Sequence, residues 1–383
     1  MRTSLRLAAA AALALSLAGM AAPGQLYKQT NLVSSQTGAA PSSDSDLVNP
    51  WGMSRSSSSP WWIADNATGL STLYSGIGDK EGLVVTIPAA VSGNKGTPTG
   101  TIYNGSKTDF LLAPGKPAAF LFSTLDGTIA GWNSSVGIPS GGSPPSTTAV
   151  TMVKTTDGSS YTGLTSAWAG GSLYLYAANF TNGSVDVYNT SFHRVHLSNA
   201  SFQDDSLPPN YVPYNVQTIG NDIVVTYALH EKGNMFETDG PGLGYVDIYS
   251  STGQLLQRLE HGNWLNAPWG VALAPLDFGL YSHDLLIAQF AGGGTTQSSG
   301  YIAAYDLVTG RFEGLLEDAS GNPIAINGIW AISPGNTSPS NNLDTGSQPS
   351  AALYFTAGPN HGTGGLFGFL SAVSTDLTKG NDQ

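Results

Sequence analysis

The most informative stretch of the sequence opens with Asn49-Pro50-Trp51-Gly52-Met53 and continues through Trp61-Trp62-Ile63-Ala64-Asp65 to Ser71-Thr72-Leu73-Tyr74. Turn-forming residues separate these runs of apolar and aromatic residues, which is typical of antiparallel strands joined by hairpins. Gly69 lies in the second turn and supplies the positive φ that a tight hairpin needs. Because one such sheet cannot bury both of its faces, the stretch predicts a fold in which the same unit is repeated.

The same pattern recurs along the rest of the chain. In each later unit two apolar runs flank a turn that contains glycine, and the second run alternates apolar with small or polar residues, as a half-buried strand does. An outer fourth strand is expected at 83–87 in the first unit and at 255–259 in the fourth. The paired runs of the later units are 120–122 with 128–132, 173–177 with 184–188, 223–226 with 244–249, 285–288 with 300–305, and 353–355 with 365–369.

Six units spaced by roughly forty to seventy residues predict an all-β fold, a six-bladed β-propeller in which each blade is a four-stranded sheet. A seven-bladed ring is the nearest alternative. Closing the ring removes exposed sheet edges, and it requires a strand from the opposite end of the chain. Residues 27–34 precede the first full unit, so we expect them to complete the last blade beside 366–369. The sequence therefore predicts a single propeller domain over residues 26–373, closed by an N-terminal strand.

The two ends of the chain have a different character. Arg2 and Arg6 flank the start of a short apolar run at 7–17, and small residues follow it. We expect residues 1–21 to be a secretory signal peptide and the mature protein to be secreted to the extracellular space. An uncleaved membrane anchor is the alternative, and no later stretch is apolar enough to span a membrane. Residues 374–383 are expected to form a polar C-terminal tail.

Composition limits the classes of function. The formal net charge of −12 disfavours binding to nucleic acid, because the phosphate backbone is also negative. The lack of cysteine excludes disulfides, thiol catalysis and cysteine-ligated metals. Hydrophobic residues make up 40% of the chain, which is enough for a large core, and we expect a monomer. Sequons make it a candidate glycoprotein if its host glycosylates secreted proteins; they begin at Asn66, Asn104, Asn133, Asn179, Asn182, Asn189, Asn199 and Asn336.

Several longer phrases carry a resemblance to known proteins. They are 31–34, 47–52, 62–69, 244–249, 266–272, 321–324 and 327–330. Through them the chain resembles a family of uncharacterised secreted propellers with Asn-Pro-Trp-Gly motifs, related to NHL-repeat propellers. The resemblance covers nearly all of the predicted mature chain and implies six blades, but it implies no reaction. The loop from His230 to Pro241 departs from the acidic, His-containing loop of that family.

Asparagines recur where the units open. Asn49, Asn215, Asn266 and Asn327 precede or begin the expected innermost strands, so we expect them to converge on the central channel. Their amide oxygens suit Ca²⁺, and the arrangement resembles the central metal of gluconolactonase-like and paraoxonase-like propellers, which polarises a lactone carbonyl. The chain departs from that pattern because no Glu stands at a unit opening. The alternative is that these asparagines cap turns and bind backbone.

Tryptophans recur at equivalent places as well. Trp51, Trp269 and Trp330 are candidates for a ligand site at the channel mouth, where their rings would stack on sugars or other flat ligands. The favoured alternative is that each ring packs between blades as part of the core. A polar residue that follows the second strand is expected to hold the adjoining turn; it is Asp65, Asn179 and Gln289 in the first, third and fifth units.

Two classes of function follow from this pattern. The first is an extracellular binding or scaffold module that uses one face of the propeller for a glycan, a small molecule or a protein. The second is a Ca²⁺-dependent, lactonase-like hydrolase or lyase with its site in the central channel. The first is favoured because Asp, Glu and His, which general acid–base catalysis needs, are sparse at the unit openings. Whether the protein is an enzyme stays open at this point.

Overall fold

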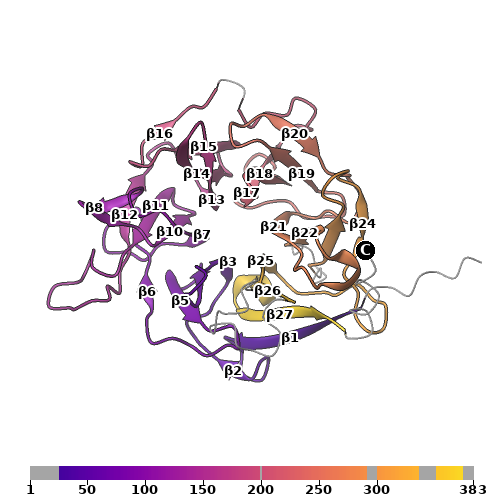
Figure 1. The fold of residues 1–383 in the computed structure, drawn as a ribbon, viewed down its shortest axis with the longest axis horizontal. Coiled ribbons are helices and arrows are strands. Elements are labelled where there is room, and N and C mark those ends of the chain that lie inside the picture. Colours follow the sequence, from indigo (N-terminus) through magenta and orange to yellow (C-terminus); the bar gives the residue numbers. More distant parts are fainter. Residues whose placement is uncertain (1–25, 199–200, 291–299, 336–350, 374–383) are drawn as a thin grey trace, which may run out of the picture.

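A computed structural model describes residues 26–198, 201–290, 300–335 and 351–373, which form a ring of six β-sheets around a central axis (Figure 1). This confirms the prediction of an all-β, six-bladed propeller, and the alternative of seven blades is wrong. The predicted signal peptide at 1–21 and the polar tail at 374–383 lie outside the described residues.

The first three blades follow one another along the chain, each with its strands ordered from the axis to the rim. Blade 1 contains β3 (Pro50–Ser54), β4 (Trp61–Asp65), β5 (Leu70–Tyr74) and β6 (Val85–Thr86). Blade 2 contains β7 (Pro98–Tyr103), β10 (Phe120–Thr124), β11 (Thr128–Trp132) and β12 (Val150–Lys154), with an added hairpin of β8 (Leu111–Ala113) and β9 (Lys116–Pro117). Blade 3 contains β13 (Tyr161–Ala169), β14 (Ser172–Asn179), β15 (Ser184–Tyr188) and β16 (Arg194–Val195).

The other three blades complete the ring. Blade 4 contains β17 (Tyr211–Ile219), β18 (Asp222–Leu229), β19 (Gly244–Tyr249) and β20 (Leu255–Arg258). Blade 5 contains β21 (Pro268–Leu273), β22 (Leu285–Gln289), β23 (Ile302–Tyr305) and β24 (Phe312–Leu315). Blade 6 contains β25 (Ile329–Pro334), β26 (Ala352–Ala357), β27 (Leu366–Ala372), β1 (Tyr27–Ser34) and β2 (Ser42–Ser43).

Helical structure is confined to two short turns in the described ranges, η1 (Gly279–Tyr281) and α1 (Pro359–Gly362). Within those ranges, neither of these turns has the length and apolar character that a membrane-crossing helix requires.

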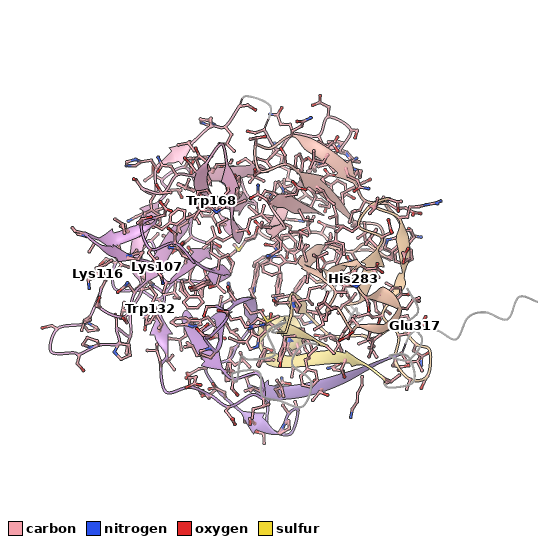
Figure 2. The ribbon with its side chains drawn as sticks, viewed as in Figure 1. Lys107, Lys116, Trp132, Trp168, His283 and Glu317 are labelled. Atoms are coloured by element: carbon pink, nitrogen blue, oxygen red, sulfur yellow. The ribbon has the colours of Figure 1, made fainter. Side chains whose placement is uncertain are left out.

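Strand β1 closes the ring, as predicted. It pairs antiparallel with β27 from Tyr27 opposite Ala372 to Ser34 opposite Leu366. It also holds blade 5, because the Tyr27 hydroxyl donates to the Phe278 carbonyl at 2.9 Å. The Tyr27 N–H donates to the carbonyl of Glu317 at 2.7 Å, and Figure 2 shows Glu317 at the outer edge of the ring. One N-terminal strand therefore completes blade 6 and ties it to its neighbour.

Six clusters of buried apolar side chains hold the blades together: five lie at an interface between two neighbours, and the sixth joins blades 6 and 1 and extends around the axis to blades 3, 4 and 5. Between blades 1 and 2, for example, Trp62 stacks on Phe120 with ring centroids 4.2 Å apart, and Trp132 packs beside them. Each large side chain buried in this way contributes about 1.5–3 kcal/mol. The core is therefore a series of contacts between blades, arranged around the axis.

The innermost strands approach so closely that the glycines of the Pro-Trp-Gly phrases have no room for a side chain. A Cβ atom on Gly52 would lie 2.5 Å from the carbonyl oxygen of Thr99 in β7. A Cβ atom on Gly270 would lie 2.3 Å from the carbonyl oxygen of Trp330 in β25. The repeated glycine is thus explained by close approach of backbones, for which only glycine is small enough.

Polar residues at the ends of the second strands hydrogen bond to nearby backbone. Asp65 Oδ2 accepts the N–H of Thr72 at 2.9 Å, and Asn179 Oδ1 accepts an N–H within its own turn. Gln289 Oε1 instead accepts the N–H of Asn266, just before β21 of the same blade, at 2.9 Å. These contacts hold the turns and the strand openings that surround one end of the channel.

Replacing Tyr27 by alanine should weaken the closure of the ring. The change removes a buried ring that packs on Phe278 and the hydroxyl bond to blade 5, so we expect a loss of about 3–5 kcal/mol in the free energy of unfolding. Lys28→Ala, at an exposed position of the same strand, should change it by less than about 0.5 kcal/mol. Urea denaturation followed by tryptophan fluorescence measures both, and equal midpoints would show that β1 does not hold the ring closed.

Candidate functional site

Three tryptophans from the innermost strands of blades 1, 5 and 6 pack against one another. Trp51 and Trp330 stack with ring centroids 3.6 Å apart. Trp269 meets them edge-on, 6.0 Å from Trp51 and 5.7 Å from Trp330. All three are buried, with no more than 7% of any of them exposed. Trp51 and Trp330 line one cavity and Trp269 lines another, so the three rings lie between two cavities.

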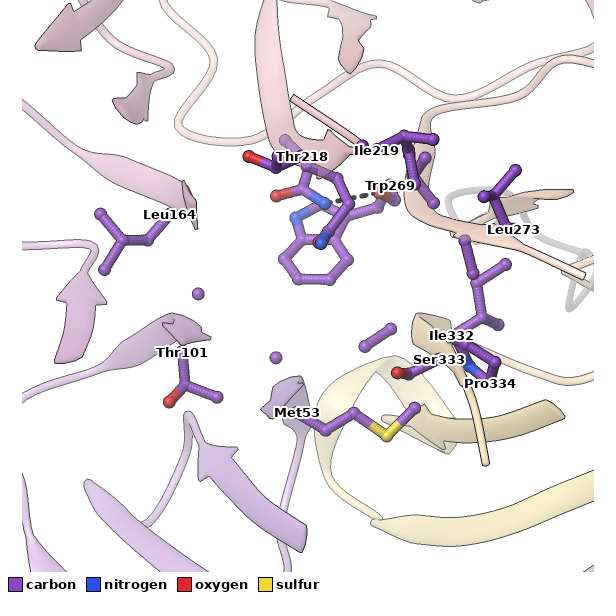
Figure 3. Close-up of a pocket in the computed structure, with 18 residues that line it drawn as sticks. Met53, Thr101, Leu164, Thr218, Ile219, Trp269, Leu273, Ile332, Ser333 and Pro334 are labelled. Atoms are coloured by element: carbon purple, nitrogen blue, oxygen red, sulfur yellow. Dashed lines mark hydrogen bonds between the residues drawn. The ribbon is translucent and has the colours of Figure 1, made fainter. Parts of the chain in front are cut away.

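The cavity on the Trp269 side, which we call the inner-strand cavity, has a volume of about 250 Å³. Figure 3 shows Trp269 reaching into the space between Met53, Thr101, Leu164 and Ile332. Asn215 also lines it, and its side-chain amide donates to the Trp269 carbonyl at 2.7 Å. None of the described residues that line this cavity is charged, so it offers no acid or base for chemistry.

The second cavity lies at the other end of the channel and has a volume of about 440 Å³. We call it the acidic cavity, because Glu237 and Asp239 line it. Its aromatic lining comprises Trp51, Tyr214, Phe236, Phe290 and Trp330, and Phe290 stacks on Trp330 with centroids 4.0 Å apart. Asn49, Asn66, Asn327 and His361 add polar groups.

A loop between β18 and β19 supplies the acids of this cavity. The loop is held by backbone bonds, such as the one from the Thr238 N–H to the Leu229 carbonyl at 2.8 Å. It is also held by Asn266, whose Oδ1 accepts the N–H of Gly240 at 2.8 Å. Asn266 therefore positions the chain next to Glu237 and Asp239 without lining the cavity itself.

Glu237 has an unusual proton affinity. Loss of solvation by burial, and then the negative charge of Asp239, raise the pKa of its carboxyl to about 7. The side chain is nevertheless partly exposed. Contact with the Tyr214 hydroxyl acts in the opposite direction but is weaker. At neutral pH both forms of Glu237 are therefore populated, and it can either accept or donate a proton.

One buried donor at this cavity, the indole N–H of Trp51, has no hydrogen-bond partner among the described residues. The hydroxyl of Tyr214 faces the carboxyl of Glu237. Trp51 is 7% exposed and Tyr214 is 1% exposed, so protein surrounds both. A buried donor without a partner costs about 1–3 kcal/mol.

The structure does not bring the four predicted asparagines together. Asn49 and Asn327 line the acidic cavity, Asn215 lines the inner-strand cavity, and Asn266 lines neither. The amide oxygen of Asn49 already accepts the indole N–H of Trp330 at 3.0 Å. That of Asn327 accepts a backbone N–H at 3.0 Å. In the described part of the chain, no three residues among His, Asp and Glu are grouped so that they could hold a metal.

The repeated unit openings do not predict the acids of this cavity, because no acid of the cavity stands at a unit opening. Glu237 and Asp239 lie instead in the loop after a second strand, within the segment that departs from the resembling family. The turns at Asn66, Leu125 and Phe290 also follow second strands, and they reach the same cavity. An acidic pair in a long loop at that point of the repeat is therefore the signal that would have located the site.

No family model matches the chain. It is 28% identical over 316 residues to the uncharacterised protein R648 of Acanthamoeba polyphaga mimivirus, covering 80% of this chain and 74% of that protein. It is also 28% identical over 354 residues to the uncharacterised protein L690 of the same virus, covering 90% and 85%. A solved glucose dehydrogenase is similar with a TM-score of 0.52 and 11% identity, covering 91% of this chain and 99% of that one. At that identity the likeness supports the propeller fold alone.

Asp239→Asn should lower the pKa of Glu237 from about 7 toward its ordinary value, because it removes the neighbouring negative charge. When folding raises the pKa of a carboxyl, the free energy of unfolding decreases as the pH rises from the pKa of the unfolded state to that of the folded state. Unfolding free energy should therefore fall less steeply between about pH 4.5 and 7 in the variant. Carboxyl NMR and urea denaturation over that range measure the two effects, with Glu237→Gln as the variant that lacks the transition. If the titration midpoint of the Glu237 carboxyl is the same in Asp239→Asn as in the unmodified protein, the two acids do not interact.

Proposed function

We propose that this protein is a binding module that takes a small organic ligand into the acidic cavity, and that it works outside the cell. One observation chiefly supports the first part: the stacked Trp51 and Trp330 rings line a cavity together with three further aromatic side chains. The second part rests on the predicted signal peptide at 1–21.

The size and lining of the cavity suit this function. Small-molecule sites are typically clefts of about 300–1,000 Å³, mostly apolar, with a few polar groups that fix the orientation of the ligand. The acidic cavity has a volume of about 440 Å³, and its aromatic rings come from blades 1, 4, 5 and 6. Stacking against such rings stabilises flat or ring-shaped ligands, including sugars.

The Ca²⁺-dependent hydrolase is less well supported. Ca²⁺ takes six to eight oxygen ligands. The oxygens of Asn49 and Asn327 already accept hydrogen bonds, and Asn215 and Asn266 lie outside the acidic cavity. Metal analysis of the purified protein tests this function. One Ca²⁺ per chain that is lost in both Asn49→Ala and Asn327→Ala would favour the hydrolase over the binding module.

Phe290→Ala should weaken ligand binding with little effect on the fold. Phe290 is half-buried and stacks on Trp330, so its loss removes one face of the site. We expect affinity to fall about three- to tenfold, the equivalent of one aromatic contact. Val308→Ala, which is 86% exposed and lines neither cavity, is the matched control.

Isothermal titration with monosaccharides, phenylalkyl compounds and indoles identifies a ligand and then compares the two variants. The proposal is contradicted if no compound of the panel binds, or if Phe290→Ala binds the identified ligand as tightly as the unmodified protein.

A further inference from the structure

The inner-strand cavity forms the end of the channel opposite the acidic cavity, and its volume is about 250 Å³. A cavity of about 150 Å³ is enough to hold one benzene molecule inside a protein. Figure 3 shows open space between Trp269, Leu164 and Met53. The inner-strand cavity therefore has room for a single ring that carries a substituent.

The deep wall of this cavity is apolar. Leu164 from blade 3, Val271 from blade 5 and Ile332 from blade 6 line it, and each is no more than 4% exposed. An apolar group that fills the space between these side chains is itself removed from water. Such burial is favourable and needs no charged partner. The deep wall therefore suits the apolar body of a ligand.

Three polar side chains on the wall have no hydrogen-bond partner among the described residues, namely those of Thr101, Gln217 and Ser333. The hydroxyl oxygen of Thr101 is buried, so a ligand does not reach it. Gln217 and Ser333 are half-buried, and Figure 3 shows Ser333 at the edge of the open space. Their amide and hydroxyl groups donate and accept hydrogen bonds without carrying charge. These two side chains are therefore the groups with which a ligand can pair.

The two groups lie near the mouth of the cavity. Gln217 and Ser333 also line a neighbouring pocket, which includes Arg55 and the exposed Ser57. Leu164 does not line that pocket. A ligand with its polar group at the mouth and its apolar body inside the cavity matches both parts of the wall.

The lining disfavours ions and sugars. None of the described residues that line the cavity is charged, and an ion that leaves water for such a place loses its solvation without gaining a partner. A monosaccharide carries more hydroxyl groups than the described wall has polar side chains within reach. Its remaining hydroxyls would lose their hydrogen bonds to water, which is costly. A ligand with one uncharged polar group avoids both costs.

From this arrangement we propose that the inner-strand cavity is a second binding site, which takes a small uncharged molecule with an apolar body and one hydroxyl group. The hydroxyl pairs with Gln217 and Ser333, and the apolar body lies against Leu164, Val271 and Ile332. The site goes beyond the function proposed for the acidic cavity and does not depend on it, because none of the described residues lines both cavities.

Methionine methyl groups report on the two cavities separately. Met53 lines the inner-strand cavity, whereas Met235 is 80% exposed and precedes Phe236 of the acidic cavity. NMR spectra of the full chain with ¹³C-labelled methionine methyls therefore follow both places in one titration. The variant Met53→Leu assigns the signal of Met53.

The probes share one ring and differ in the group that it carries: benzyl alcohol, toluene, benzylamine and benzoate. The Met53 signal should shift saturably with benzyl alcohol at neutral pH, with an affinity about tenfold higher than for either ion. Gln217→Leu with Ser333→Ala should lower the affinity for benzyl alcohol about five- to tenfold, the equivalent of one hydrogen bond, and leave that for toluene unchanged. Gln254→Leu with Ser58→Ala makes the same changes at exposed positions outside both cavities and is the matched control.

Each other outcome overturns the inference in its own way. A Met53 signal that shifts with none of the probes at millimolar concentration would show that the cavity holds water only. A shift of Met235 alone would place binding in the acidic cavity. Benzoate or benzylamine that binds as tightly as benzyl alcohol would contradict the uncharged ligand. Equal affinity of the Gln217 and Ser333 double variant and the unmodified protein for benzyl alcohol would contradict the pairing of its hydroxyl, and retained toluene binding shows that the variant is folded.

Discussion

The close packing of the innermost strands around the axis is the constraint on which the rest of the structure depends. Gly52 and Gly270 let neighbouring backbones approach to distances at which a Cβ would collide with a carbonyl oxygen. The tryptophan before each of these glycines packs with Trp330 between the two cavities. The repeated Pro-Trp-Gly phrase thus sets both the width of the channel and its division into two cavities with different chemistry, one uncharged and one acidic.

The pairing of β1 with β27 closes the ring, and it joins six sheets that would not be stable separately into one domain. Each blade buries its faces mainly against its two neighbours, so a missing contact at the closing interface would leave apolar faces of two blades uncovered. A complete ring also brings together turns that are far apart in the chain. Asn66, Leu125, Phe290 and the loop with Glu237 come from four blades, and they meet at one end of the channel. The candidate site is therefore a property of the closed ring and of no single blade.

The fold was predictable because its signals are local: alternating strands, glycine turns and an unpaired N-terminal run. The site was predictable only in part. Trp51, Trp330, Asn49 and Asn327 line one cavity. The other two asparagines, Asn215 and Asn266, do not reach it, although the sequence pattern places all four at equivalent positions. Asn215 is the fifth residue of β17, whereas Asn266 precedes β21, so they occupy different heights along the axis. Glu237 lies in the loop after a second strand and at no unit opening, and the bond from the Gly240 N–H to Asn266 that holds this loop is a tertiary contact.

The pairing of β1 with β27 also has a kinetic consequence. The first and last described strands are neighbours, so the ring cannot close until β27 has been synthesised. Contacts of such long sequence separation slow folding and leave strand edges uncovered meanwhile. Those edges accept the matching strand of any nearby copy. The ladder that makes one chain a closed ring would, at high concentration, link two chains by reciprocal exchange of their N-terminal strands.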